Sequence, residues 1–444
     1  MCRVRGAAEA QAALLRRRSG VASHDTSWTN VASSSVSVDA IRRGARRRRH
    51  SASDDLPVFI ADAGAHNPSI TRHFSRAIDP TRRGAVDKEM RRHQRSNVHQ
   101  VNRTAKYLRH EGCIFTDINL DHLRSRPHSD KNLAWAEKIE CKMTKPNFKL
   151  RTTTTLLFGA NRQPAVLYLS YHYDAEGNKI RDNIPDRALL AKHINTQKLA
   201  HEFPNQIDIS SGDQRHEADQ SYPLMFYKVA GTDIIRYEHK GVRHDCQYWT
   251  EQGHPDRVRP SAALLGRSSA ERNRIVQLTH TDWKIQDLVS RYVKRFFPQQ
   301  FRLLKIAFDR GHWASSDYNE EGYEGGIFFN RVTLWKSTAR MHRDRKDYLC
   351  AIFCSGAFEG GELVLPDVRM KFKYSPGDIV IFFSDAFYHS ILPWAPLLKQ
   401  PEDIVSPGRV SWVLNTHTDV LNRFLQDDYE ELIYRGQGYR QGYQ

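Results

Sequence analysis

The sequence has few cysteines and no long apolar segment. Its 444 residues include six cysteines, which are scattered and never form a Cys-x-x-Cys pair. Such a set predicts neither a disulfide framework nor a paired-cysteine zinc site, and it is typical of a reducing compartment. No apolar run approaches the length that crosses a bilayer, and the first residues lack the apolar core of a secretory signal peptide. We therefore expect no membrane partner, whereas the oligomeric state is left open.

Positive charge is concentrated near the N-terminus. The net charge is +16, and residues 1–110 hold 22 of the 67 Lys+Arg but only 9 of the 51 Asp+Glu. The densest cluster, Arg42–Arg49, lies in Ala- and Ser-rich sequence with few large apolar residues. Such sequence cannot bury enough apolar surface to offset its ordering entropy. We therefore expect a disordered basic leader over residues 1–100.

This basic leader is compatible with more than one role. The cluster Arg42–Arg49 suits nuclear import or contact with the phosphates of DNA or RNA. Residues 1–30, with Ala-Ala-Leu-Leu-Arg-Arg-Arg and few acids, instead resemble a mitochondrial presequence. A third interpretation is a solvated tail without an address, in a cytoplasmic protein. We favour a nuclear protein, because a nucleic-acid substrate would be found in the nucleus.

The last third of the chain predicts eight short strands separated by Gly, Pro, Asp and Ser. They cover residues 326–335, 339–344, 348–354, 362–365, 370–374, 379–383, 388–394 and 409–414. Many short strands with this punctuation are typical of a double-sheet jelly roll, also called a double-stranded β-helix. We therefore predict an α+β fold in which a jelly-roll core is flanked by helices.

The tripeptide His-x-Asp occurs six times, so it carries no weight by itself. The copies begin at His128, His172, His254, His280, His342 and His417. Only the copy at His342 lies on a predicted strand that is followed by both a second histidine, His389, and an arginine-bearing strand. Because alternate residues of a strand face the same side, His342 and Asp344 can both face the interior of the barrel.

These residue types fit a metal site with an anion clamp. Two histidines and one carboxylate hold ferrous iron on adjacent faces and leave positions open for substrate and O2. Arg409 has the fork of donors that binds a carboxylate, and Ser411 shares its face of the last strand. We predict His342, Asp344 and His389 as metal ligands and catalytic residues.

At these residues the sequence resembles the iron(II)/2-oxoglutarate-dependent dioxygenase superfamily. The resemblance is carried by His342-Arg343-Asp344, Gly360-Gly361-Glu362-Leu363, Pro376-Gly377-Asp378, His389 and Arg409-x-Ser411. Over residues 325–424 the chain is similar, more narrowly, to the fungal Tet/JBP-like branch, which oxidises the methyl group of thymine or 5-methylcytosine. The resemblance implies Fe(II), 2-oxoglutarate and O2 as cofactors, with Arg409 and Ser411 binding 2-oxoglutarate. It also implies DNA or RNA as a partner, contacted in part by the leader.

Two departures from the family pattern leave the substrate open. The segment 395–408 makes the gap between His389 and Arg409 long, and we expect it to form a loop over the barrel mouth. The cysteine-rich zinc segment of animal Tet enzymes is also missing. A protein or small-molecule hydroxylase is the alternative, since residues 111–444 are nearly neutral, with 45 Lys+Arg and 42 Asp+Glu. A non-catalytic nucleic-acid-binding protein is a third candidate. It is disfavoured because all four residue types of the site are intact, at His342, Asp344, His389 and Arg409.

The remaining sequence predicts an extension and a helix. Residues 101–266 form an α/β extension with strand candidates at 150–159, 165–172 and 225–229, either flanking the barrel or as a separate small unit. An amphipathic helix follows from about Glu271 to Phe297 and is ended by Pro298. It opens the catalytic domain, 267–425, before a polar tail, 426–444. We interpret His244, Cys246 and His254 as structural, because their spacing is irregular.

Overall fold

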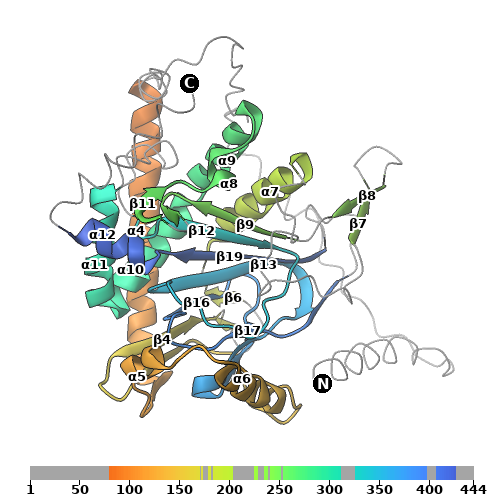
Figure 1. Ribbon diagram of the computed structural model, residues 1–444. Helices are drawn as coiled ribbons and strands as arrows, with labels where there is room; N and C mark the ends of the chain where they lie inside the picture. The colour runs from red at the N-terminus through yellow and green to blue at the C-terminus, as the bar shows by residue number, and fades with distance from the viewer. Residues whose placement is uncertain are drawn as a thin grey trace, which may run out of the picture. The chain divides into compact units, whose positions relative to one another are not determined.

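The computed structural model describes residues 80–426, with gaps at 171, 174–178, 182–183, 204–224, 229–234, 239–240, 252–253, 312–325 and 398–406. These residues form a mixed α/β fold on one large and one small β-sheet (Figure 1). The predicted leader up to residue 79, almost all of the predicted tail and most of the loop 395–408 lie outside the described residues. Among the described helices, none is long and apolar enough to cross a membrane.

The large sheet has nine strands, eight of them on one continuous path. In order along this path they are β1 (Cys113–Phe115), β3 (Thr155–Phe158), β4 (Pro164–Leu169), β16 (Ile379–Phe382), β13 (Cys350–Gly360), β19 (Gly408–Asn415), β12 (Asn330–Trp335) and β9 (Gly241–Cys246). The ninth, β18 (Trp394–Pro396), pairs with the end of β13. Four of the eight predicted strands, β16, β13, β19 and β12, are therefore antiparallel neighbours at its centre.

The small sheet contains the other predicted strands that form ladders. Its order is β17 (Ser390–Ile391), β14 (Leu363–Leu365), β15 (Met370–Phe372) and β2 (Leu150–Arg151). The chain thus crosses between the two sheets, since β12, β13, β16 and β19 belong to one and β14, β15 and β17 to the other. Three hairpins stand apart: β5 (His172–Tyr173) with β6 (Lys179–Arg181), β7 (Met225–Lys228) with β8 (Ile235–Glu238), and β10 (Trp249–Glu251) with β11 (His254–Arg259).

Two predicted strands are much shorter than expected. The segment 339–344 forms no strand, and its regular pairing is a single antiparallel bridge between His342 and His389. The segment 388–394 keeps only β17 and the start of β18. The pairing of the segment 339–344 does not continue past His342. The next main-chain N–H on that side, that of Asp344, donates to the carbonyl of Ser384 at 3.0 Å, and Ser384 lies outside the strands.

The extension before the core contributes strands to both sheets. The predicted strands 150–159 and 165–172 correspond to β2, β3 and β4, and β4 pairs with β16 along four residues. β2 pairs with β15. Strands of this part of the chain thus share ladders with strands of both sheets.

The predicted helix from Glu271 to Phe297 is two helices. α9 (Ser269–Thr281) and α10 (Trp283–Phe296) are divided at Asp282, whose buried carboxylate accepts from Lys192 Nζ at 2.6 and 2.8 Å. Pro298 ends α10 but also opens α11 (Pro298–Gly311), which the sequence analysis missed. A proline fits the first turn of a helix because its missing N–H would have no intrahelical acceptor there.

A second missed helix overlaps the predicted leader. α4 (Pro80–His110) begins twenty residues before the predicted boundary at residue 100. It packs on α10 partly through polar side chains: Asn97 donates to Asp287 at 2.8 Å and Thr104 contacts the Tyr292 hydroxyl at 3.0 Å. An apolar stripe therefore gives only a weak signal for this helix.

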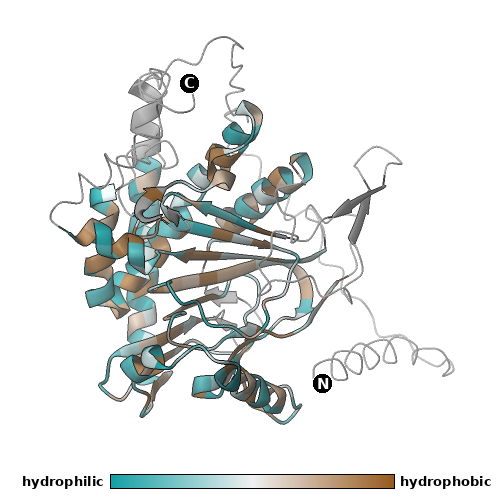
Figure 2. Cartoon of the chain, in the orientation of Figure 1, coloured by the Kyte–Doolittle hydropathy of each residue, from teal (hydrophilic) through white to brown (hydrophobic). Residues whose placement is uncertain are grey.

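The other helices are α5 (Leu120–Ser125), α6 (Asp130–Met143), α7 (Asp186–Glu202), α8 (Ala262–Leu265) and α12 (Thr418–Leu425), with a 3-10 turn at Pro366–Val368. α7 and α10 cover one face of the large sheet, where His193 of α7 meets Trp335 and Trp412 at ring distances of 6.1 and 6.3 Å. Figure 2 shows apolar and polar residues together on the helices and on β12 and β19, whereas β16 is entirely apolar in sequence. The opposite face of the large sheet, with Val332, Leu334 and Val413, packs toward Ile391 of the small sheet.

Candidate metal centre

Three predicted site residues lie together at the bridge between the two short segments. His342 and His389 are opposite each other, and each main-chain N–H donates to the other's carbonyl, at 3.0 and 2.8 Å. Asp344 lies two residues after His342, so its side chain returns to the same side of the segment. Both histidines are largely buried, whereas Asp344 is half-buried.

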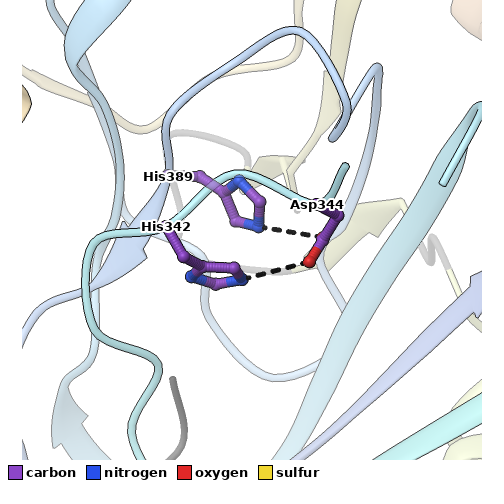
Figure 3. Close-up of side chains that lie close together, drawn as sticks. All are labelled: His342, Asp344 and His389. Atoms are coloured by element: carbon purple, nitrogen blue, oxygen red, sulfur yellow. Dashed lines mark ion pairs between the residues drawn. The ribbon is translucent and has the colours of Figure 1, made fainter. Parts of the chain in front are cut away.

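The side chains converge on one point (Figure 3). Asp344 Oδ1 is 3.6 Å from His342 Nε2, and Asp344 Oδ2 is 3.5 Å from His389 Nε2. One ligand atom from each residue falls within 4.8 Å of the others, and among the described residues no other group of three or more metal-ligating side chains does so. Ligands about 2.1 Å from a metal at right angles lie about 3 Å apart, so small side-chain movements suffice for one ion to contact all three.

Main-chain carbonyls fix the tautomer of both imidazoles. His342 Nδ1 is 2.6 Å from the carbonyl of Arg340, and His389 Nδ1 is 3.1 Å from that of Phe387. A carbonyl only accepts, so each Nδ1 carries the proton and donates. Each Nε2 therefore keeps its lone pair, which is the state that ligates a metal.

Arg409 and Ser411 lie on β19 with unsatisfied polar atoms. Arg409 is only 1% exposed, and its Nε and Nη2 have no hydrogen-bond partner among the described residues. No described carboxylate forms an ion pair with it. The Oγ of Ser411 and the buried hydroxyl of Tyr374 also lack partners. A buried guanidinium without a counter-charge is costly, so this donor set fits an external carboxylate such as that of 2-oxoglutarate.

Two aromatic rings and one glycine shape the surroundings of this guanidinium. The carbon at its centre is 5.0 Å from the ring of Tyr374 and 5.7 Å from that of Phe358. A Cβ built on Gly361 would lie 3.3 Å from Arg409 Cδ and 3.2 Å from Phe358. The Gly360-Gly361 turn therefore leaves room for the arginine side chain, which explains why glycine occupies position 361.

A second set of polar residues, missed in the sequence analysis, lies on the same face of the large sheet as Arg409 and Ser411. Asn330 and Asn415 are opposite each other on β12 and β19, and the amide of Asn415 donates to Asp347. Asn330 is 1% exposed, yet neither amide atom has a partner among the described residues. Nearby, His417 pairs with Asp347 through the main chain and lies 5.5 Å from the ring of Trp249, which is 39% exposed.

The other His-x-Asp copies whose side chains are described have different surroundings. His128 accepts from Arg343 Nε at 3.1 Å, and His280 lies on α9. His244 and Cys246 lie on β9, where burial raises the pKa of the Cys246 thiol well above its ordinary value. A thiol held in its protonated form does not favour a metal site at this position.

No protein-family model and no curated protein matches the sequence. The structure is similar to that of NgTET1 in complex with 5mC DNA, at 11% identity and a TM-score of 0.39, over 66% of this chain and 92% of that chain. It is similar to an oxidoreductase of the 2OG-Fe(II) oxygenase family from Burkholderia pseudomallei, at 16% identity and a TM-score of 0.22, over 44% and 71% of the two chains. It is also similar to a Pseudomonas putida prolyl-4-hydroxylase, at 8% identity and a TM-score of 0.25, over 53% and 90%.

Proposed function

We propose that the chain is an Fe(II)- and 2-oxoglutarate-dependent dioxygenase that hydroxylates a substrate C–H bond. The observation that carries the proposal is the convergence of His342, Asp344 and His389, whose ligand atoms lie within 4.8 Å of one another. Two imidazoles and one carboxylate on one side of an ion are typical of non-heme iron oxygenases. The buried guanidinium of Arg409, whose Nε and Nη2 have no hydrogen-bond partner among the described residues, supports the second half of the proposal, a carboxylate cosubstrate.

The strand order supports a jelly-roll core. Strands β12, β13, β16 and β19 belong to the large sheet, whereas β14, β15 and β17 belong to the small one. The bridge between His342 and His389 adds the segment 339–344 beside β17. We infer that these eight segments form the predicted double-stranded β-helix, with the metal centre at the bridge.

Each residue of the site would have a distinct task. The Nε2 atoms of His342 and His389 and a carboxylate oxygen of Asp344 would hold Fe(II). Arg409 would bind the distal carboxylate of 2-oxoglutarate, with Ser411 and Tyr374 donating from their hydroxyls. When bound, iron and 2-oxoglutarate supply the activation of O2 and the oxidation of the substrate. The residues of the chain bind and orient these groups and exclude water.

We propose a modified base in DNA or RNA as the substrate class. The polar set of Asn330, Asn415 and Asp347 offers donors and acceptors on the inner face, and Trp249 offers a partly exposed aromatic surface. Planar heterocycles with polar edges need both kinds of contact. The basic leader, with its surplus of arginine, would contact phosphates and direct the protein to the nucleus.

Incubation of the full chain with methylated DNA, Fe(II) and 2-oxoglutarate tests the proposal, with succinate and nucleosides measured by mass spectrometry. An oxidised base formed together with succinate is the expected result. Succinate without an oxidised base would overturn the base as substrate and favour the protein or small-molecule hydroxylase, which the near-neutral charge of residues 111–444 supports. Absence of both products would contradict the dioxygenase itself.

A further inference from the structure

The two segments that carry the metal ligands have an outer face as well as an inner one. Side chains alternate along extended chain, so residues 341 and 343 face away from the side taken by His342 and Asp344. In the same way, residues 388, 390 and 392 face away from His389. The contacts of these five outward-facing residues, Met341, Arg343, Tyr388, Ser390 and Leu392, show what covers the metal centre from outside.

All five contact the segment formed by α5, α6 and the turn between them, residues 120–143. Ala136 of α6 is fully buried in a cluster with Met341 and Tyr388. Further along the same helix, Ile139 and Met143 pack against Leu392. The hydroxyl of Ser390 donates to the buried carboxylate of Glu140. In Figure 1, α6 accordingly lies beside β17, which follows His389.

Arg343 makes the densest set of polar contacts with this segment. It lies between two of the proposed ligands, His342 and Asp344, and is 5% exposed. Its Nη1 donates to the carbonyl of Leu123 and its Nη2 to that of Arg126, both at 2.6 Å. Its Nε donates to His128 Nε2 at 3.1 Å. The planar fork thus joins the ligand segment to three acceptors, one on α5 and two on the turn after it.

Two further ion pairs brace the neighbourhood of His389. Arg126 Nη1 is 2.7 Å from Asp367, whose other carboxylate oxygen accepts the main-chain N–H of Tyr388 at 2.8 Å. Arg124 Nε is 2.9 Å from Asp385, the residue after Ser384. Since the carbonyl of Ser384 accepts from the N–H of Asp344, this pair lies beside the main-chain contact of the third ligand.

The ligand segments need such support because their own ladder is minimal. Between them they form one bridge and one further main-chain hydrogen bond, from the N–H of Ile391 to the carbonyl of Ala339 at 3.0 Å, and β17 is only two residues long. A metal site requires its ligands to be held in position by residues that do not touch the metal, and removal of such supporting residues typically weakens metal binding about 10–100-fold.

We propose that residues 120–143 form the outer wall of the metal centre, and that Arg343 is its main positioning residue. This inference rests on the proposed metal site. It assigns a role in metal binding to the α5–α6 segment, although that segment supplies none of the three proposed ligands. Removal of Arg343 would let the bridge between His342 and His389 shift, and the three ligands would no longer converge on one ion.

Titration of the full chain with Co(II) tests this, with the visible ligand-field spectrum as the readout of coordination geometry. Arg343→Leu is expected to weaken Co(II) binding about 10–100-fold and to alter the spectrum. The Co(II) affinity of Arg343→Lys is expected to lie between that of Arg343→Leu and that of the unaltered chain. An ammonium group cannot donate to both carbonyls in the way that the planar guanidinium does. The matched control is Arg310→Leu. Arg310 also donates to two carbonyls, those of Phe424 and Gln426, at 2.9 and 3.1 Å, but it lies on α11.

The outcomes separate this inference from the proposed function. If Arg343→Leu bound Co(II) as tightly as the unaltered chain and gave the same spectrum, the positioning role would be overturned while the metal site stood. If the unaltered chain bound no Co(II), the metal site would fail and the inference with it. Should Arg343→Leu not fold, Arg126→Gln decides, since that side chain is partly exposed: unchanged affinity and spectrum would overturn the inference, and weaker binding would support it.

Discussion

His342 and His389 are joined by two main-chain hydrogen bonds, and their imidazole centroids are 4.1 Å apart. Residues from two distant segments thus face one point, where Asp344 presents one carboxylate oxygen to each ring. Because both Nδ1 atoms donate to main-chain carbonyls, both Nε2 atoms are available as ligands. This pairing, more than the His-x-Asp tripeptide, distinguishes the site from the other copies in the chain.

Arg409→Lys is expected to raise the KM for 2-oxoglutarate about 10–100-fold while kcat at saturating cosubstrate changes little. Lysine keeps the positive charge but loses the two-pronged hydrogen bonding, and a hydrogen bond to a charged group contributes about 1.5–3 kcal/mol. Initial rates of succinate formation across a 2-oxoglutarate titration measure this. An unchanged KM would show that Arg409 does not bind the cosubstrate.

Asn330→Leu is expected to stabilise the folded chain and impair its response to substrate. The amide is buried with no partner among the described residues for either polar atom, and an unsatisfied buried group costs about 1–3 kcal/mol, which a leucine of similar size avoids. Thermal unfolding measures the stability. Stimulation of 2-oxoglutarate turnover by methylated DNA measures the function. A variant that is more stable and responds fully to DNA would remove Asn330 from the substrate site.

His128→Gln is expected to make the stability of the folded chain less sensitive to acid. Burial, followed by the charges of Arg343, Arg345 and Arg126, lowers the pKa of His128 from 6.5 to about 4. Between these values the unfolded chain binds a proton that the folded chain does not, so stability from this group is lost as pH falls through that window. Glutamine does not titrate and can still accept from Arg343. The melting temperature of the variant, relative to that of the unaltered chain, should therefore rise as pH falls from 6.5 to 4. A constant difference would refute the assignment.

Removal of residues 1–79 is expected to weaken binding to nucleic acid and to flatten its salt dependence. These residues carry 13 Lys+Arg and 7 Asp+Glu, and the cut leaves α4 intact because that helix begins at Pro80. For each phosphate that the shortened chain no longer neutralises, the slope of log affinity against log salt becomes shallower by about 0.9 on duplex DNA. Fluorescence anisotropy at several salt concentrations measures both quantities. Undiminished affinity would place the electrostatic contacts in the rest of the chain.

The sequence predicts the centre of the fold better than its surroundings. Strand punctuation and order are local signals, so they indicated β12 to β19 and the sequence of His342, His389 and Arg409. By contrast, α4 packs partly through Asn97 and Thr104, and these polar side chains interrupt the apolar stripe formed by Val101, Ala105 and Leu108. Position 298 was interpreted only as a helix end, although proline also favours the first turn of the next helix.

Contacts between distant segments account for what the sequence could not predict. Asn330 and Asn415 become neighbours only through the pairing of β12 with β19, and Trp249 approaches His417 only once β10 is in place. Likewise, no local sequence pattern in residues 120–143 indicates that they pack against the segments that carry His342 and His389. Arg343 donates to the carbonyl of Leu123, a residue more than two hundred positions earlier in the chain. Local hydrophobic patterns do not predict contacts at such separations.

Fe(II)-dependent conversion of 2-oxoglutarate to succinate tests the central claim most directly. The comparison uses the unaltered chain, His342→Ala and His280→Ala, the last of which alters another His-x-Asp copy, on α9. If His342, Asp344 and His389 hold the iron, the unaltered chain and His280→Ala will turn over 2-oxoglutarate, whereas the turnover of His342→Ala will fall to background. Equal turnover by His342→Ala and the unaltered chain would contradict it.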